Sequence, residues 1–253
     1  MKTETVAEVA ATGKGETAAA ARELALDVRE LGRRFGDREA LDRVSLQLER
    51  GRTLAVFGPN GAGKTTFLRV LATLLLPHAG SVRVLDRELP RDAHAVRGRV
   101  GFIGHEALLY RDLTGRENLE FYARLYQVEG AQDRIDDLLQ RTAMSKRAND
   151  PVRDLSRGMV QRLAVCRAVL HSPELLLLDE PTAGLDPEAA QLVDPLIGQA
   201  SGCTRVLVSH DVQLGLARSD RVLGLRAGRV LAEGPSAAIE APQVQALYKG
   251  ESR

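Results

Sequence analysis

One octapeptide decides the fold of this chain: Gly58-Pro59-Asn60-Gly61-Ala62-Gly63-Lys64-Thr65. It matches the phosphate-binding pattern G-x-x-x-x-G-K-[ST] at every fixed position. The glycines let backbone N–H groups surround phosphate oxygens, and a helix N-terminus behind the loop adds partial positive charge. The flanks fit this interpretation. An apolar run typical of a strand precedes the loop at 53–57, and helical periodicity follows at 65–75, with Pro77 and Gly80 expected to end the helix.

A second segment supplies acids to the same kind of site. The apolar run 175–178 is typical of a strand buried on both faces, and it ends in Asp179 and Glu180. Ligands bind at the carboxyl edge of parallel sheets, so we expect these acids near the loop. Lys64 would reach the β- and γ-phosphates, while Thr65 and Asp179 would hold Mg²⁺. Glu180 is suited to polarise an attacking water, with a solvated strand-end acid as the alternative. These two motifs specify a P-loop ATPase or GTPase.

Composition limits the remaining classes. The chain has 253 residues, 44% of them hydrophobic and 27% charged, with a net charge of +1. This is ordinary globular composition, and no nucleic-acid partner is expected. Cys166 and Cys203 lack metal-ligand spacing, and Cys166 is expected to be a buried thiol. No apolar stretch approaches the roughly 18 residues of a membrane span, so membrane association is expected only through a partner. Residues 1–21 are interpreted as a disordered lead-in and residues 22–253 as one domain.

The rest of the chain predicts a mixed architecture. Segments 24–28 and 44–48 alternate apolar and polar residues, as in an antiparallel sheet with one buried face. Strands and helices alternate later in the chain, which implies a parallel sheet. Residues 104–172 are expected to be mainly helical, and Thr114 with Glu117 predicts a capping box. The following helix carries residues at helical spacing that are expected to pack in the core, with a docking surface as the alternative: Leu119, Tyr122, Leu125 and Tyr126.

Three further segments narrow the class: Leu155-Ser156-Arg157-Gly158-Met159, Ala183-Gly184-Leu185-Asp186 and Ser209-His210-Asp211. In this order they resemble the signature (LSGGQ), the D-loop and the switch histidine of ATP-binding subunits of ABC transporters. Arg157 and Met159 depart from the signature, whereas Ser156 and Gly158 keep the residues suited to approach a phosphate. The resemblance runs from about Leu24 to Gly234.

The resemblance implies a P-loop NTPase fold in the α/β class, with a mainly parallel sheet core, an antiparallel β subdomain and an inserted helical subdomain. It implies ATP and Mg²⁺ as cofactors, and ATP contacts from the loop Gly58–Thr65 and from Thr66. Phe35 would stack on adenine, with a packed loop aromatic as the alternative. His210 would contact the γ-phosphate and support Glu180 in catalysis. Asp186 would make a contact across a dimer, although helix capping alone also explains it.

The same resemblance implies partners and a location. The signature residues of one chain would complete the site of another in a homodimer or a pair of ATPase subunits: Ser156, Arg157, Gly158 and Met159. A separate integral membrane permease would hold the ATPase on the inner face of the cell membrane, on the cytoplasmic side.

The type of transporter depends on a departure at Gly104-His105, because the family has glutamine where His105 stands. His105 could accept the attacking water or ligate metal weakly. The pair, with the segment 113–122, resembles the ATP-binding subunit of the haem exporter in cytochrome c maturation. The signature with Gln161 resembles exporters of drugs, lipids or polysaccharides equally well. Of the two assignments, the haem exporter is favoured and the other exporters are the alternative. A soluble ABC ATPase acting on ribosomes or DNA, and a P-loop kinase, are the other classes. The single domain argues against the first of these, and His210 with the signature argues against the second.

Overall fold

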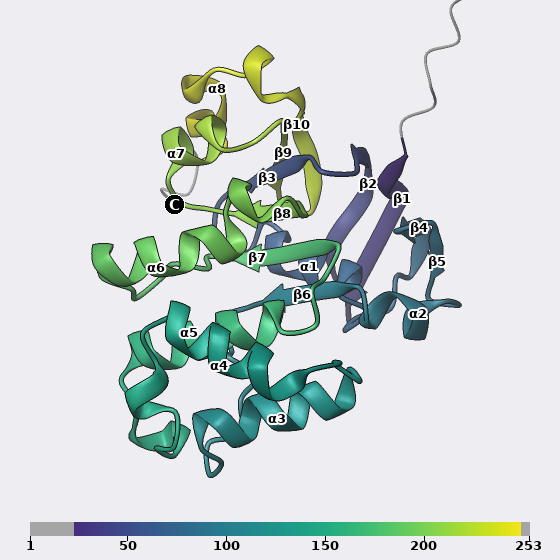
Figure 1. Ribbon diagram of the computed structural model, residues 1–253. Coiled ribbons are helices and arrows are strands. Elements are labelled where there is room, and N and C mark those ends of the chain that lie inside the picture. The colour runs from purple at the N-terminus through teal and green to yellow at the C-terminus, as the bar shows by residue number, and fades with distance from the viewer. Residues whose placement is uncertain (1–22, 249–253) are drawn as a thin grey trace, which may run out of the picture.

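A six-stranded sheet runs through the middle of the molecule in the computed structural model, which describes residues 23–248 (Figure 1). Its order is β10-β9-β3-β8-β7-β6, and only the β9–β10 pair is antiparallel. The strands are β3 (Thr53–Phe57), β6 (Val100–Ile103), β7 (Leu175–Asp179), β8 (Thr204–Val208), β9 (Arg221–Arg226) and β10 (Arg229–Pro235). Every residue of β7 is buried. Leu175 and Leu177 join one core cluster, and Leu176 and Leu178 join another, because successive side chains point to opposite faces.

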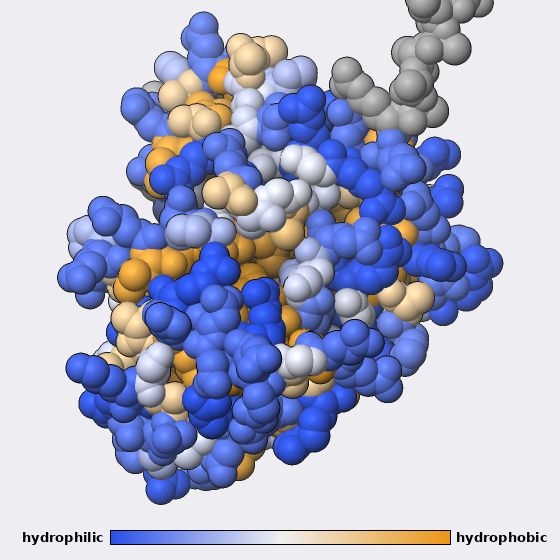
Figure 2. Space-filling view, viewed as in Figure 1, coloured by the Kyte–Doolittle hydropathy of each residue, from blue (hydrophilic) through white to orange (hydrophobic). Residues whose placement is uncertain are grey.

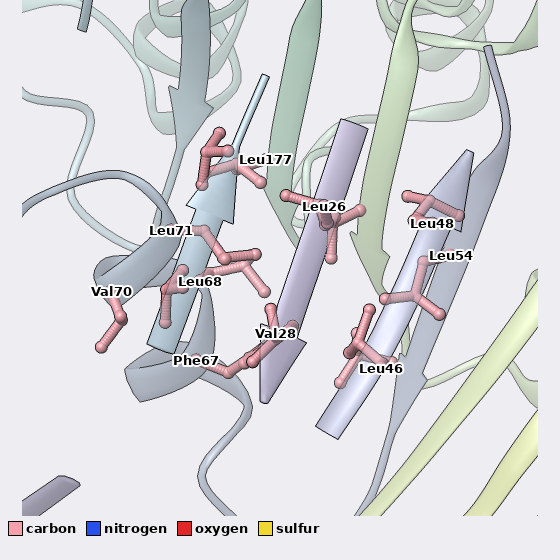
Figure 3. Close-up of a cluster of buried hydrophobic side chains, with 14 of the residues drawn as sticks. Leu26, Val28, Leu46, Leu48, Leu54, Phe67, Leu68, Val70, Leu71 and Leu177 are labelled. Carbon is pink, nitrogen blue, oxygen red and sulfur yellow. The ribbon is translucent and has the colours of Figure 1, made fainter. Parts of the chain in front are cut away.

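A second sheet packs beside the first. It is antiparallel, in the order β2-β1-β4-β5, and consists of β1 (Leu24–Phe35), β2 (Arg38–Glu49), β4 (Ala79–Val84) and β5 (Arg87–Leu89). Leu26 is paired with Leu48 and Val28 with Leu46, so their side chains share one face. That face packs against α1 (Lys64–Leu71), where Phe67 lies, in the cluster that Figure 3 draws. The predicted α/β class, with a mainly parallel sheet and an antiparallel β subdomain, is confirmed.

Helices occupy the segment between β6 and β7 and form the lower lobe in Figure 1. They are α3 (Gly115–Leu125), α4 (Ala131–Arg141) and α5 (Arg157–Val169), with the short 3₁₀ turns η1 (Ser145–Arg147) and η2 (Val152–Asp154). The capping box is present: Thr114 Oγ1 accepts from Glu117 N at 3.1 Å, and Glu117 Oε2 accepts from Thr114 N at 2.8 Å. It fixes the start of α3.

The remaining helices lie around the large sheet. They are α2 (Ala93–Arg97), α6 (Pro187–Ile197), η3 (Gln199–Ser201), α7 (Val212–Ala217), η4 (Ser236–Ala238) and α8 (Ala241–Ala246). Within residues 23–248, no helix combines the length and the apolar character that crossing a membrane requires. The face in Figure 2 is mostly hydrophilic at its margins, and its hydrophobic residues gather across the middle.

Some local expectations need correction. The helix after the glycine loop ends at Leu71 rather than at Leu75, because Thr73 adopts φ +61° and Leu75 N turns back to Arg69 O at 3.1 Å. Of the residues expected in the core, Leu119 is fully buried, but Leu125 is 62% exposed. That leucine occupies the last position of α3.

Two predictions concern the thiols and the N-terminus. Cys166 is buried as predicted, and burial raises the pKa of its thiol to about 11. Neither cysteine forms a disulfide. The predicted lead-in at residues 1–21 lies outside the described residues.

Candidate nucleotide site

The glycine loop spans the gap between the end of β3 and the start of α1. Gly58 has φ +147°, and a Cβ added to it would lie 2.1 Å from the carbonyl oxygen of Leu225. Gly63 has φ +107°, and a Cβ there would lie 2.5 Å from the carbonyl oxygen of Ala40. Only glycine therefore fits these two positions, which explains the sequence pattern. Lys64 is buried within the loop, where its Nζ donates to the carbonyl oxygens of Gly58 at 2.6 Å and Pro59 at 2.9 Å.

A cleft of about 390 Å³ opens above this loop. Its lining joins residues from four distant parts of the sequence: Phe35, Arg38, Ala40, Asn60, Gly61, Ala62, Gly63, Lys64, Thr65, Thr66, His105, Asp179 and Glu180. Most of the expected ATP contacts, from Phe35 and from residues 60–66, thus share one cavity. Gly58 and Pro59 do not line it; they form the base of the loop. Phe35 is 46% exposed at the rim, with the Arg33 guanidinium 4.6 Å from its ring centroid.

Oxygen and nitrogen ligands meet at one end of the cleft. Asp179, at the end of β7, accepts a hydrogen bond from Thr65 Oγ1 to its Oδ2 at 2.7 Å. His105 Nε2 lies 3.9 Å from the same oxygen. The carboxylate of Glu180 completes a group whose ligand atoms all lie within 4.8 Å of one another. A hydroxyl beside carboxylates is the hard oxygen set that Mg²⁺ prefers, so Thr65 and Asp179 fit the expected ion.

Glu180 and His210 form a pair at the carboxyl edge of the sheet. Glu180 follows β7 with φ +53°, and its N–H donates to the carbonyl oxygen of Val208, at the end of β8, at 3.2 Å. This backbone bond holds the two strand ends together, so that His210 Nε2 lies 2.6 Å from Glu180 Oε1. A carboxylate oxygen can only accept, so the imidazole nitrogen is the donor in this contact. The pair can orient a water and receive its proton.

The signature segment lies apart from the cleft. Ser156 caps α5, its Oγ accepting from Met159 N at 3.3 Å, and Arg157 begins the helix. A Cβ added to Gly158 would lie 3.4 Å from the carbonyl oxygen of Gly184, so the signature packs against the predicted D-loop of its own chain. Among the described residues, none of Ser156, Arg157, Gly158 and Met159 lines the nucleotide cleft.

Asp186 follows the same segment and caps α6, its Oδ1 accepting from Ala189 N at 2.8 Å. The sequence allowed two roles for Asp186, a helix cap and a contact across a dimer, and the helix cap is observed. A contact of Asp186 across a dimer stays a prediction.

Two residues at the site were missed by sequence reasoning. Arg38 lines the cleft and donates from Nη2 to the carbonyl oxygen of Gly61 at 3.3 Å. Tyr248 accepts a hydrogen bond on its hydroxyl from Gly58 N at 3.1 Å, and burial raises the pKa of this tyrosine. Arg38 follows Phe35 in the same hairpin, and this proximity could have indicated it. Tyr248 lies 190 residues from its partner, and no local pattern announces it.

A profile of the ABC transporter family matches residues 41–183, more than half of the chain. This chain belongs to the ABC transporter family. The daunorubicin resistance ATP-binding protein DrrA3 of Streptomyces coeruleorubidus is 41% identical to it, over 83% of this chain and 67% of that protein. The Nod factor export ATP-binding protein I of Ralstonia nicotianae is 36% identical, over 83% of this chain and 66% of that protein. The chain thus spans about two thirds of the length of these relatives.

Solved structures agree with this family. An ATP-binding subunit of an ABC transporter is 26% identical, with a TM-score of 0.80 over 88% of this chain and 99% of that one. A dimeric ATP-binding cassette in a post-hydrolysis state, bound to ADP and Pi, is 25% identical, with a TM-score of 0.76 over 83% of this chain and 98% of that one. The predicted ABC-type ATP hydrolase is confirmed. The expected resemblance to haem exporters finds no support, because the relatives named above are drug-resistance and Nod factor export proteins.

Proposed function

We propose that this ABC ATPase powers export through a separate membrane subunit, and that it works as a nucleotide-sandwich dimer. The observation that carries the proposal is the division of the site. Lys64, Asp179 and Glu180 share one cleft, whereas the signature segment lies outside that cleft on the same chain. A single chain therefore holds both halves of a site but does not join them.

Within one chain, the residues of the cleft suit a sequence of simple tasks. Lys64 and the loop amides bind the phosphates, and Thr65 with Asp179 would hold Mg²⁺, which supplies positive charge beside them. Glu180 accepts the proton of a water whose oxygen forms a bond to the γ-phosphorus while the bond to the β–γ bridging oxygen breaks. His210 keeps the Glu180 carboxylate in place by donating a hydrogen bond from Nε2 to Oε1 across 2.6 Å. Phe35 stacks on adenine at the rim.

The second half of each site comes from a partner copy. Ser156, Gly158 and the N-terminus of the thirteen-residue helix α5 form a phosphate-binding end that its own chain does not use. In a two-fold symmetric dimer, each signature can face the cleft of the other chain, which gives two complete sites. The packing of Gly158 on Gly184 would make the signature and the D-loop move as one unit.

This chain has a groove in which the membrane subunit could dock. The groove, of about 590 Å³, is lined by residues 72–74 after α1, by α2 and β6, by the end of α3 and by the carboxyl end of α5. Its rim carries Leu74, Leu108 and Leu125, which are 54%, 39% and 62% exposed. Exposed apolar side chains around one groove are typical of a protein interface, and the apolar face of an amphipathic helix fits such a groove. We propose that a helix of the membrane subunit docks there and keeps the ATPase at the cytoplasmic face.

The groove also touches the catalytic end of the molecule. Arg167, which is 4% exposed, lies in its floor and donates to the carbonyl oxygens of Phe102 and Ala107. These two carbonyls flank His105 in the sequence, so movement of the groove lining would move His105 toward or away from Asp179.

For the cargo, the names of the relatives favour a drug or a polysaccharide-type molecule over haem. Affinity purification from native membranes in mild detergent, followed by mass spectrometry, tests the whole proposal. We expect an ABC permease to co-purify. The L125D variant should lose this partner, whereas L231D, at a leucine of β10 that is 57% exposed, should keep it. Recovery of ribosomal or DNA-associated proteins alone would contradict the transport role.

A further inference from the structure

The nucleotide site contains a ligand set that is unusual for a magnesium site. Its ligand atoms come from the imidazole of His105 and the carboxylates of Asp179 and Glu180, all within 4.8 Å of one another. In the part of the chain that the structure describes, this is the one group of three such residues close enough to share an ion. Two carboxylates balance the charge of a divalent cation, and the imidazole adds a nitrogen donor.

The three ligands are held in place independently of any ion. The Asp179 side chain is 1% exposed and accepts the hydrogen bond of Thr65 at 2.7 Å. Glu180 follows it directly; its backbone N–H is bonded to the end of β8, and its Oε1 lies 2.6 Å from His210 Nε2. His105 is 61% exposed, but its loop is anchored on both sides by the Arg167 guanidinium, which binds the carbonyls of residues 102 and 107. The imidazole therefore stays near the acids and is open to ions from solvent.

The donor chemistry discriminates between metals. Imidazole nitrogen suits Zn²⁺, Co²⁺ and Ni²⁺, whereas Mg²⁺ demands octahedral oxygen ligands and keeps several waters. We propose that the nucleotide-free site binds a transition-metal ion of the Zn²⁺ or Co²⁺ class through His105 Nε2, Asp179 and Glu180, more tightly than it binds Mg²⁺. Because Asp179 and Glu180 also serve the nucleotide, the bound ion competes with Mg²⁺–ATP. Bound Zn²⁺ would therefore inhibit the ATPase, and this regulatory effect rests on the proposed function.

Direct binding to the untagged full chain tests the inference. Isothermal titration without nucleotide should give one Zn²⁺ site per chain, with Mg²⁺ binding at least about 100-fold weaker, as nitrogen ligation predicts. The H105Q variant should bind Zn²⁺ at least about 10-fold more weakly and leave Mg²⁺ binding unchanged, because one metal ligand is lost. The matched control is H78Q, which removes an exposed imidazole far from the acids in the sequence and should bind Zn²⁺ as the wild type does. With Co²⁺, the wild type and H78Q should show the same visible absorption bands, and H105Q should show weaker ones.

Two results overturn the inference: Zn²⁺ affinity of H105Q within about twofold of the wild type, or an equal loss in H78Q. Phosphate release with Mg²⁺–ATP, measured on the same preparations, separates this inference from the proposed function. If phosphate is released from Mg²⁺–ATP but no Zn²⁺ binding is found, only the metal inference is refuted. If Zn²⁺ binds as expected but no phosphate is released from Mg²⁺–ATP, the proposed function is contradicted and the metal inference stands.

Discussion

Replacing Gly158 with alanine separates the stability of this chain from its catalysis. A Cβ at this position would meet only the carbonyl oxygen of Gly184 at 3.4 Å and Leu185 Cδ2 at 3.8 Å, which are ordinary contacts. Gly158 lies in the first turn of α5, where alanine restricts the unfolded chain more than glycine does. We therefore expect G158A to fold and to gain about 0.5 kcal/mol of stability. For a domain of this size, that gain raises the melting temperature by about 1–2 °C.

Catalysis should change in the opposite direction. In the sandwich dimer, Gly158 lets the backbone approach the γ-phosphate held by the partner, and a methyl group there blocks the approach. Phosphate release by G158A should fall at least about 10-fold, because the charge-stabilising contacts to the transferring phosphoryl group are lost. Binding of ATP to a single chain should be retained, since Gly158 does not line that cleft.

A mixed dimer tests whether the contact is made between chains. K64A damages the loop of its own cleft and keeps an intact signature, so K64A and G158A carry complementary defects. In a dimer of one chain of each, one of the two sites receives an intact loop and an intact signature. Co-expression in equal amounts should restore about one quarter of wild-type turnover, because half of the dimers are mixed and each has one good site. The reasoning is refuted if mixing restores nothing, or if G158A alone hydrolyses ATP at the wild-type rate.

Three further predictions follow from the same geometry. E180Q should lower phosphate release at least about 100-fold while ATP binding is retained, because the proton acceptor is lost, and E188Q on α6 should leave both unchanged. Y248F removes the acceptor of the Gly58 N–H bond and should cost about 1 kcal/mol, a fall in melting temperature of about 2–4 °C in thermal denaturation. Burial lowers the pKa of His171 to about 4, so the unfolded chain binds a proton there first as the pH falls. The free energy of unfolding therefore falls as the pH drops from about 6.5 to about 4, by at most about 3 kcal/mol, and this loss is absent above pH 6.5. H171F removes the titrating group, so its free energy of unfolding, measured by chemical denaturation, should change less over that pH range.

Much of the fold could be predicted because its signals are local. The strand before the glycine loop and the strand before the acids are short apolar runs, and both are observed at the expected residues. The capping box at Thr114 and the cap at Asp186 depend on neighbours three residues away, so the sequence displays them directly. The end of α1 was misplaced, because leucines 74–76 continue an apolar pattern while Thr73 has already left the helix.

The parts that sequence reasoning missed depend on contacts between distant segments. Tyr248 reaches Gly58 only because Val244 and Leu247 pack α8 and its C-terminal end against β3 and β9. Arg38 reaches Gly61 because the antiparallel sheet packs over α1. Leu125 has the helical spacing of a core residue, and whether such a residue is covered depends on what packs against that face. Periodicity identifies a helix and one apolar face, but the packing of other elements decides which residues of that face stay exposed.

Arg167 connects the proposed docking groove with the nucleotide site. A guanidinium that is 4% exposed and has no carboxylate partner among the described residues is costly to bury, and desolvation lowers its pKa. Its hydrogen bonds to the carbonyls of residues 102 and 107 offset part of that cost, and they hold the loop of His105 against the floor of the groove. Displacing the loop would leave a buried charge without these acceptors. The loop is therefore expected to move together with α5, the helix that carries Arg167. Through this side chain, a partner bound in the groove would affect the metal-ligating end of the nucleotide site, and that site would affect the partner in turn.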